Sequence, residues 1–364
     1  MTEFLQRREK LWQKVREKVD AFLLVNVEGS EQPNLRYLTG FTGTFGVLIL
    51  AEESLFFTDP RYTEQAKHQV DLEVLEVRGR WLPQVVEKLR SLGAKKVGIG
   101  STRTTLHLFE ELKKAGEDLE FVPLGSPVEE LRRVKTEAEI KKMKEAVELT
   151  EAGLRWILGR LKPGMTEREV ALELEFWYRK EGADDVAFDL IVAAGPQSAM
   201  PHHRAGNHVL QEGEVVLFDI GVRLDGYCAD ITRVVGLGNP EKGVKDAYKL
   251  VLSANAAGIR AIRAGIPGKD VDAQARKIIE DAGLGENFGH GLGHGVGMEV
   301  HEGPRLSTTS EDVLVPGNVV TVEPGVYFPG KFGVRIEDMV AVTEEGALVL
   351  SAFPKDELLV VGRR

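Results

Sequence analysis

The sequence predicts an α/β domain followed by an α+β domain that is built from two related halves. Three observations predict this fold. The chain has 364 residues, more than one compact core usually holds. Strand and helix patterns alternate through residues 20–125, and a weak internal repeat follows in the remaining sequence. We therefore expect two domains, residues 1–127 and residues 128–364.

The first domain is expected to open with an amphipathic helix, because MTEFLQRREKLWQKVREKV places its apolar residues at helical spacing. Apolar runs that are typical of strands follow, together with one further helical pattern. The predicted strands are AFLLVNV, TFGVLIL, SLFFTD and KKVGIG, and the predicted helix is WLPQVVEKLRSLGA. This alternation is typical of an α/β domain.

The second domain is expected to begin with a long, charged, amphipathic helical segment within residues 128–161. Within it, Thr136 and Glu139 have the spacing of a capping box, in which each side chain binds a backbone N–H group of the first turn. The pair therefore marks a helix start.

An internal repeat relates the two halves of the second domain. KPGMTEREVALELEFWYRKEGA, from Lys162, matches RAGIPGKDVDAQARKIIEDAGL, from Arg263. The matches keep a constant offset of 101 residues: Gly164 with Gly265, Val170 with Val271, and Gly182 with Gly283. In each half a helix pattern is followed by strand-rich sequence. We therefore expect a pseudo-two-fold α+β layer rather than a doubly wound sheet.

Composition excludes several classes of protein. With 47 basic and 57 acidic residues and a pI near 5.5, the chain lacks the cationic excess that nucleic acid or anionic lipid requires, so neither is expected as a partner. No apolar run reaches the ~18 residues of a membrane span, and the opening segment lacks the apolar core of a signal peptide. The single cysteine, Cys228, excludes an intramolecular disulfide framework. A cytoplasmic location is expected.

A first pair of acidic residues is predicted on a hairpin. Two apolar, β-branched runs flank Asp225-Gly226, which is a strong hairpin signal. A two-residue turn at this position sets Asp230 opposite Gly221, and Asp219 then lies one pleat away on the same face. The carboxylates of Asp219 and Asp230 are therefore expected to converge.

A second pair is predicted in VVTVEPGVYFPGKFGVRIEDMVAV. A three-residue loop over residues 329–331 sets Glu323 opposite Glu337, provided that Pro324 lies at a bulge or an edge. The two hairpins thus present four acids in two facing pairs. Such a cluster repels itself unless cations neutralise it.

A glycine-rich segment with three histidines lies between the two hairpins. It contains His290, His294 and His301. The glycines that alternate with these residues make a helix unfavourable, so an extended segment is expected, with His290 and His294 on one face. The sequence has no HExxH motif, which excludes an ordinary zincin.

Through these motifs the chain resembles the pita-bread metallopeptidases, the family of creatinase, prolidase and methionine aminopeptidase. The resemblance is to the branch of Xaa-Pro aminopeptidase (aminopeptidase P) and prolidase, and it covers nearly the whole length. It implies a creatinase-like N-terminal α/β domain and a pita-bread catalytic domain. The motifs are GHGVGMEVHEGP, VEPGVY, GVRIED, the spacing of eleven between Asp219 and Asp230, and, in the first domain, NLRYLTGFTGTFG and TDPRY.

The resemblance also implies roles for individual residues. The ligands of two divalent metal ions would be Asp219, Asp230, His294, Glu323 and Glu337, with Asp230 and Glu337 bridging the ions. Manganese or cobalt is expected, with zinc and iron as alternatives. His202 and His301 would hold the substrate and the tetrahedral intermediate, although the adjacent His203 is an alternative to His202. Glu323 would also carry the proton. His290 would line the pocket, Arg335 would orient a ligand carboxylate, and Tyr227 and Arg305 would contact substrate.

The activity that the resemblance implies is hydrolysis of the bond before a proline at the second position of a peptide, which releases the N-terminal residue. The alternatives are a prolidase restricted to Xaa-Pro dipeptides and an inactive peptide-binding module of the same fold. The complete ligand set disfavours the inactive module, and the N-terminal domain disfavours methionine aminopeptidase. A homodimer is expected on the same grounds.

Overall fold

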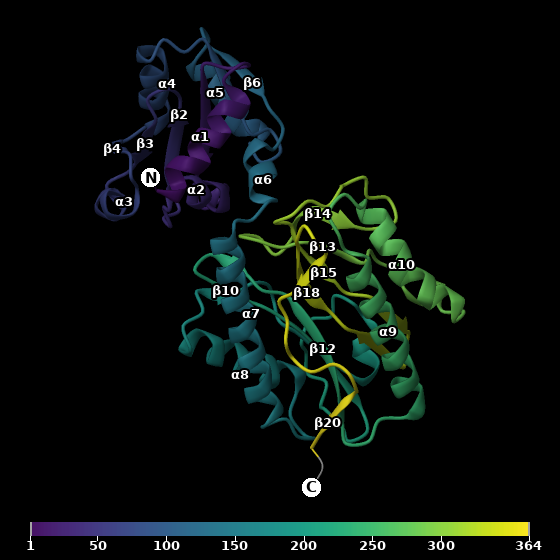
Figure 1. Ribbon diagram of the computed structural model, residues 1–364. Coiled ribbons are helices and arrows are strands. Elements are labelled where there is room, and N and C mark those ends of the chain that lie inside the picture. The colour runs from purple at the N-terminus through teal and green to yellow at the C-terminus, as the bar shows by residue number, and fades with distance from the viewer. Residues whose placement is uncertain (1, 363–364) are drawn as a thin grey trace. The chain divides into compact units, whose positions relative to one another are not determined.

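The computed structural model describes residues 2–362, which form two compact units, Met1–Arg132 and Arg133–Arg364 in the full numbering (Figure 1). The division falls a few residues beyond the boundary predicted near residue 128. That boundary stays a prediction about where an independently folding domain begins. Each unit is described by itself below.

The first unit is an α/β domain around one mixed sheet. Its strands have the spatial order β4-β3-β2-β1-β5-β6, where β1 pairs antiparallel with β2 and parallel with β5. The strands are β1 (Ala21–Asn26), β2 (Gly46–Leu50), β3 (Leu55–Thr58), β4 (Glu73–Glu76), β5 (Lys96–Ile99) and β6 (Glu120–Pro123). The helices are α1 (Glu3–Val15), α2 (Gln32–Thr39), α3 (Thr63–Gln69), α4 (Trp81–Ser91), α5 (Leu106–Ala115) and α6 (Pro127–Arg132).

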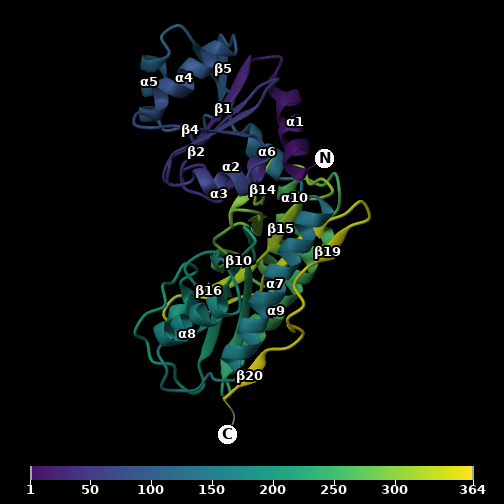
Figure 2. The ribbon, with the colours of Figure 1, turned by 90° about the vertical axis from the view of Figure 1, so that its left-hand side faces the viewer.

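Helices cover both faces of this sheet. In Figure 2, α1 lies on one side of β1 and β2, and α4 and α5 lie on the other. Leu23 of β1 and Val47 of β2 pack in one buried cluster with Val86 and Leu89 of α4. All four predicted strands and both predicted helices are confirmed, because each apolar run has a covered sheet face or helix face to pack against.

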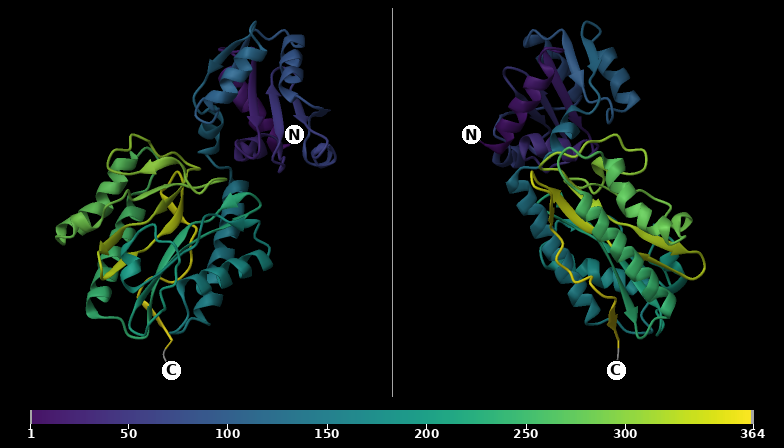
Figure 3. Two further views of the ribbon diagram at one scale, coloured as in Figure 1. Left: turned by 180° about the vertical axis from the view of Figure 1, so that it is seen from behind. Right: turned by 45° about the vertical axis from the view of Figure 1, so that its right-hand side comes forward.

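Up to residue 362, the second unit contains four long helices and four small sheets. The helices are α7 (Glu137–Leu158), α8 (Glu167–Lys180), α9 (Lys242–Ala261) and α10 (Gly268–Asp281), with the 3₁₀ turns η1 (Gly195–Ala199) and η2 (Gly285–Asn287). In Figure 1, α7 and α8 lie on one side of the strands and α9 and α10 on the other. The view from behind in Figure 3 shows the same arrangement.

The sheets of the second unit follow the two halves of the repeat, except that the C-terminal strand β20 joins the sheet of the first half. The spatial orders are β11-β10-β7, β20-β12-β9-β8, β14-β13-β15-β18-β19 and β16-β17. The strands are β7 (Asp185–Val186), β8 (Ile191–Ala194), β9 (Val215–Ile220), β10 (Val222–Leu224), β11 (Tyr227–Cys228), β12 (Ile231–Leu237), β13 (Gly293–Gly295), β14 (Glu302–Leu306), β15 (Val319–Val322), β16 (Gly325–Phe328), β17 (Phe332–Arg335), β18 (Asp338–Val342), β19 (Ala347–Val349) and β20 (Leu359–Val361).

The structure confirms the internal repeat. Helices α8 and α10 each have 14 residues, and both of their ends keep the offset of 101. The N–H of Gly164 donates to Leu210 O at 2.9 Å, and the matching Gly265 donates to Leu314 O at 2.8 Å. Gly164 and Gly265 also share a left-handed backbone, with φ of 96° and 81°. The second unit is therefore built from two related halves.

Local sequence explains how the helices of the first half start and pack. Thr136 and Glu139 form the predicted capping box of α7. At Gly153 of α7, an added Cβ would lie 2.2 Å from the ring of Tyr178, so only glycine lets α8 come this close. The Tyr178 hydroxyl then donates to Thr150 O at 2.8 Å.

Within the described residues, no helix combines the length and the apolar character that crossing a bilayer requires.

Candidate active site

A cavity of about 790 Å³ opens among the strands of the second unit. Its walls include all five predicted metal ligands: Asp219, Asp230, His294, Glu323 and Glu337. The ligands come from segments spread over more than one hundred residues of sequence. Strand ends and strand interruptions bring them together.

The first hairpin brings Asp219 and Asp230 to the cavity in the predicted register. Asp225 and Gly226 have φ values of 47° and 80°, as a two-residue hairpin turn requires. The same register continues into the longer strands, where Asp219 of β9 lies opposite Thr232 of β12. Asp230 lies in the gap between β11 and β12. The predicted pairing across this turn is confirmed.

The second hairpin also keeps its predicted register. Phe328 pairs with Phe332 across the three-residue loop, and Val322 of β15 still pairs in step with Asp338 of β18. Regular pairing is interrupted between these two sets, where Glu323 and Glu337 lie. Pro324 falls in this interruption, between the end of β15 and the start of β16, rather than at the bulge or edge that the sequence predicted.

The donor atoms of Asp230, His294 and Glu337 all lie within 4.8 Å of one another. The His294 Nε2 atom is 3.6 Å from Asp230 Oδ2 and 3.4 Å from Glu323 Oε1. The His294 Nδ1 atom lies 3.1 Å from Gly295 O, which can only accept, so Nδ1 carries the proton. Nε2 is therefore free to bind a metal ion among the carboxylates.

The electrostatics of the cavity favour a bound cation. Burial raises the pKa of Glu323 to about 8, and repulsion from Asp219 adds to this effect. Burial also raises the pKa values of Glu337 and Asp230 well above their usual range, and each is raised further by neighbouring carboxylates. Four carboxylates this close cannot all be charged at neutral pH without a neutralising ion.

The donor atoms present fit divalent metal ions. Among the described residues, Asp219 Oδ1 is a buried atom without a hydrogen-bond partner. A buried carboxylate oxygen that lacks a donor is costly, and a metal ion would remove that cost. Four carboxylates and one imidazole suit manganese, cobalt, iron or zinc.

Two threonines and an arginine hold the carboxylates of the predicted ligands in place. The Thr232 hydroxyl donates to Glu337 Oε2 at 2.7 Å, and Thr321 Oγ1 donates to Glu323 Oε1 at 3.2 Å. The Arg335 Nη2 atom donates to the second Asp219 oxygen, Oδ2, at 2.5 Å. The role of Arg335 was predicted from the sequence, whereas neither threonine was. The predicted register contained a signal for Thr232, which it sets opposite Asp219.

A chain of hydrogen bonds links Arg335 to His290. Arg335 Nη1 donates to the Tyr327 hydroxyl oxygen at 2.8 Å, and this hydroxyl lies 2.9 Å from His290 Nε2. His290 Nδ1 donates to Gly291 O at 2.8 Å, so Nε2 accepts from Tyr327. Burial, with repulsion from Arg335, lowers the pKa of His290 to about 4 and keeps the ring neutral. Tyr327 belongs to VEPGVY, but the sequence analysis gave it no role.

The remaining histidines differ in their surroundings. His202 and His301 line the cavity and are exposed. Burial lowers the pKa of His301, and repulsion from His202 contributes. The side chains of His202 and His301 therefore lie near each other. His203 also lines the cavity, but its Nε2 atom lies 2.8 Å from Glu167 Oε2. Of the two adjacent histidines, His203 is therefore the one that a buried carboxylate anchors.

The two predicted substrate contacts have different outcomes. Arg305 lines the cavity. Tyr227 does not: it is buried, and its hydroxyl donates to Glu139 Oε1 of α7 at 2.9 Å. Lys142 of the same helix lies over its ring. The prediction for Tyr227 is corrected, because β11 packs this side chain against α7 rather than toward the cavity.

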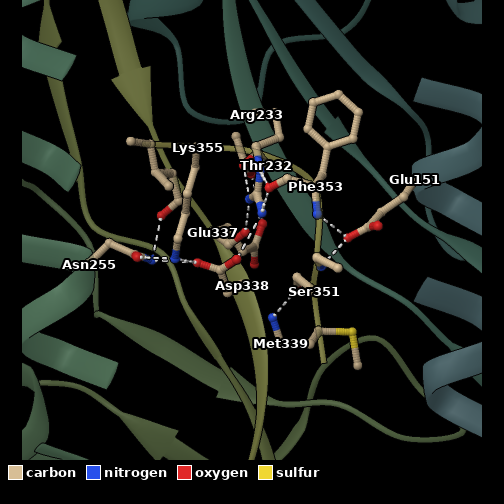
Figure 4. A network of polar contacts seen from close by, with 12 residues as sticks. Glu151, Thr232, Arg233, Asn255, Glu337, Asp338, Met339, Ser351, Phe353 and Lys355 are labelled. Atoms are coloured by element: carbon tan, nitrogen blue, oxygen red, sulfur yellow. Dashed lines mark hydrogen bonds and ion pairs between the residues drawn. The ribbon is translucent and has the colours of Figure 1, made fainter. Parts of the chain in front are cut away.

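A buried charged cluster supports the main chain beside Glu337 (Figure 4). Arg233 Nη2 donates to Asp338 Oδ1 at 2.8 Å, and Arg233 Nη1 donates to Glu337 O. Lys355 binds the other Asp338 oxygen, to which Asn255 Nδ2 also donates at 3.0 Å. Although burial opposes it, attraction from Arg233 and Lys355 holds the pKa of Asp338 below its usual value.

The C-terminal segment 351–355 ties this cluster to neighbouring elements (Figure 4). Phe353 O accepts a hydrogen bond from Arg233 Nη2 at 3.1 Å, and Phe353 N donates to Glu151 Oε1 of α7 at 2.7 Å. Met339 N donates to Ser351 Oγ at 2.9 Å. The segment therefore supports Glu337 from the side of β18.

Comparison with known proteins agrees with this geometry. Residues 141–344 match Metallopeptidase family M24, and residues 7–134 match the Creatinase/Prolidase N-terminal domain. The chain belongs to metallopeptidase family M24. The expected fold, an N-terminal creatinase-like domain with a pita-bread catalytic domain, is thereby confirmed.

Three relatives of this M24 metallopeptidase are similar over almost the whole chain. The Xaa-Pro dipeptidase of Pyrococcus horikoshii is 35% identical over 341 residues, 93% of this chain and 94% of the relative. The structure of X-Pro aminopeptidase from Thermotoga maritima matches with a TM-score of 0.92 and 41% identity, covering 98% of this chain and 100% of that one. An Xaa-Pro dipeptidase structure from Bacillus anthracis matches with a TM-score of 0.94, equal identity and equal coverage.

Proposed function

We propose that this M24 metallopeptidase hydrolyses the Xaa-Pro bond at the N-terminus of peptides and releases the N-terminal residue. The observation that carries the proposal is the convergence of five metal-binding side chains with His202 and His301 in one open cavity. The similarity to Xaa-Pro dipeptidases and an X-Pro aminopeptidase supports the proline preference.

The proposed site holds two divalent ions, manganese or cobalt first, with zinc and iron as alternatives. The residues that would hold these ions are Asp219, Asp230, His294, Glu323 and Glu337. Ions of this kind supply Lewis acidity, which lowers the pKa of water and polarises a scissile carbonyl. A donor set of oxygens and one imidazole supports this assignment.

The chain's own residues supply the remaining chemistry. Glu323 takes a proton from the attacking water and delivers it to the leaving nitrogen. His202 and His301, at the rim of the cavity, donate hydrogen bonds to the substrate and to the oxygen that gains charge in the tetrahedral intermediate. Arg335 keeps Asp219 oriented throughout. His290 forms part of the substrate-facing wall.

A site for Xaa-Pro bonds has a physical rationale. The amide nitrogen before proline has no hydrogen, and the residue before proline is conformationally restricted, so peptidases that bind that hydrogen handle the bond badly. A site that relies on cations and histidine donors at the carbonyl does not need that amide hydrogen.

A prolidase restricted to dipeptides is the second candidate. Arg305 favours it, because this arginine lines the cavity and can pair with the free carboxylate of a dipeptide. The solved relatives with 41% identity include both an X-Pro aminopeptidase and an Xaa-Pro dipeptidase, so identity does not discriminate. The inactive peptide-binding module is disfavoured by the intact ligand set.

Product analysis tests these candidates. Metal-stripped protein, with and without added manganese or cobalt, is incubated with Ala-Pro, Ala-Pro-Ala and Ala-Ala-Ala. Metal-dependent release of alanine from Ala-Pro-Ala supports the aminopeptidase. Cleavage of Ala-Pro alone supports the prolidase. Folded, metal-loaded protein that cleaves none of the three would overturn both.

Two further expectations belong to the proposal. We propose a cytoplasmic location, which the single buried Cys228 supports because it leaves no disulfide to maintain. We also propose a homodimer on family grounds. Sizing in solution tests the dimer, and a monomer with full activity would show that a partner subunit is not needed at the site.

A further inference from the structure

Helix α8 anchors the loop that carries His202. Glu167, the first residue of α8, has a side chain with 0% exposure. Its Oε1 atom accepts from Ala194 N at 2.8 Å, and its Oε2 atom accepts from Gly206 N at 3.0 Å. Oε2 also accepts from His203 Nε2 at 2.8 Å. One buried carboxylate therefore holds the strand before the loop and two points within it.

The loop is fixed on both sides of His202. The His203 side chain is 12% exposed and points its Nε2 atom at Glu167. Its N–H donates to Met200 O at 3.1 Å, which closes a turn around His202. In addition, the Arg168 N–H donates back to Gly206 O at 3.0 Å. Both His202 and His203 line the cavity, but His203 is anchored on α8 and His202 is the exposed one of the two.

Helix α10 anchors the second loop, which carries His290. Arg276 forms two hydrogen bonds to the buried Asp272, from Nε at 2.7 Å and from Nη2 at 3.0 Å. The same guanidinium donates to Phe288 O at 3.0 Å and to His290 O at 2.7 Å. Asp272 Oδ1 also accepts from Leu292 N at 2.9 Å. The main chain is thus fixed before, at and after His290.

The two anchors lie on equivalent helices but are different constructions. Glu167 is the first residue of α8, whereas Asp272 is the fifth residue of α10. The first anchor pairs its carboxylate with a histidine of the loop, and the second with an arginine of its own helix. Because the pairs do not match residue by residue, inheritance from the repeat alone does not explain them. Both nevertheless end at a loop with a cavity histidine.

We propose that the Glu167–His203 and Asp272–Arg276 pairs are positioning residues, each of which sets one histidine, His202 or His290 respectively, against the substrate. This inference rests on the proposed function, since it assigns these histidines to the peptide site. Loss of an anchor lets the loop move, and a displacement of about 1 Å in a reacting group costs up to about a hundredfold in rate. At His202 the effect falls on kcat more than on KM, because this histidine acts on the transition state. At His290, which forms part of the pocket wall, the effect falls on kcat/KM.

Crossed double-mutant cycles test the proposal in the metal-loaded enzyme, with whichever Xaa-Pro peptide it cleaves. His203→Leu is expected to lower kcat about tenfold or more, and His203→Gln, which keeps an N–H donor, to restore most of it. In a His202→Ala background, His203→Leu should have no further effect. In a His290→Ala background, it should keep its full effect.

The second cycle mirrors the first. Arg276→Met, which keeps the apolar stem of the side chain, should lower kcat/KM in the native background and in His202→Ala. It should have no further effect in His290→Ala. Equal losses in both backgrounds, for either anchor, would overturn the proposal, since a general loss of stability acts in every background.

The chain offers a matched control for His203. His208 forms a similar pair, with Nε2 at 3.1 Å from Glu214 Oε1 and an 18% exposed side chain, at the end of the same loop. It does not line the cavity. His208→Leu should therefore leave kcat unchanged. A loss as large as that of His203→Leu would overturn the proposal.

A readout without catalysis separates this inference from the proposed function. In zinc-loaded protein with ¹³C-labelled histidine rings, His203→Leu should shift or broaden the His202 signal and leave that of His290 in place. Arg276→Met should do the reverse. If these shifts occur but no Xaa-Pro peptide is cleaved, the proposed function fails and the anchors stand. If neither signal responds, the anchors fail.

Discussion

Arg335 binds one oxygen of Asp219 and leaves the other to the cavity. Arg335 Nη2 lies 2.5 Å from Asp219 Oδ2, while Oδ1, also buried, has no hydrogen-bond partner among the described residues. The arginine thus fixes the orientation of the Asp219 carboxylate, so that Oδ1 faces the other predicted ligands. The proposed metal affinity should depend on a residue that is not itself a ligand.

We therefore expect Arg335→Met to weaken metal binding by about tenfold to a hundredfold, as loss of such a partner typically does. Competition with a fluorescent chelator measures this without using activity. Arg305→Met is the matched control, because Arg305 lines the same cavity and, among the described residues, its side chain makes no hydrogen bond or ion pair to a predicted ligand carboxylate. Unchanged affinity in Arg335→Met would contradict the orienting role.

Thr232 should also strengthen metal binding, through its hydrogen bond to Glu337. Its hydroxyl donates to Glu337 Oε2 and accepts from Arg335 Nε at 3.1 Å, so it joins the two halves of the ligand set. Thr232→Val keeps the shape and removes both bonds, which should cost about 1–3 kcal/mol in metal binding. Thr232→Ser should restore most of the affinity. Calorimetric titration with manganese compares the three proteins, and equal affinities would refute the link.

Hairpin geometry explains why much of the site could be predicted from sequence. A turn at Asp225-Gly226 and a loop at residues 329–331 each define a register by counting, and both registers extend beyond the hairpin itself. Even the interruption at Pro324 leaves the count unchanged. The repeat likewise predicted both helices that anchor the histidine loops.

Contacts between distant segments explain what could not be predicted. His203 binds Glu167 across 36 residues of sequence, and Asp338 is held by Arg233, 105 residues earlier. Tyr227 follows the hairpin turn and yet faces α7, because a helix covers that side of its short strand. Periodicity determines the face of a strand but not which element covers that face.

The cluster behind Glu337 should be important for stability. Arg233 and Asp338 are 2% and 1% exposed, so Arg233→Met leaves a buried carboxylate without its main partner and should cost about 3–5 kcal/mol in unfolding free energy. Lys355→Met should cost less, since Lys355 is 22% exposed. Urea unfolding measures the stability of both variants. The fluorescence of the stacked pair Trp156–Trp177 reports unfolding, in a background where Trp12 and Trp81 are replaced by phenylalanine. The reverse order of losses would contradict this account.

Stability of the metal-free protein should fall as pH rises through the neutral range. Burial raises the pKa of Glu323 from 4.5 to about 8, so the folded protein holds a proton that the unfolded chain has released. The stabilisation is complete below pH 4.5 and is lost as pH rises toward 8. The raised pKa values of Asp230 and Glu337 act with the same sign.

Glu323→Gln should flatten this dependence, because an amide does not titrate. One proton contributes at most about 1.4 kcal/mol per pH unit to the slope. Denaturant unfolding of metal-free protein at several pH values between 5 and 8 measures this slope of unfolding free energy against pH. Glu344 is exposed, and Glu344→Gln serves as the control that keeps the native slope. With manganese bound, the sign reverses, since the ligands must lose protons to bind and the stabilisation by metal grows with pH. Equal slopes for the native protein and Glu323→Gln would show that this carboxylate does not hold the proton.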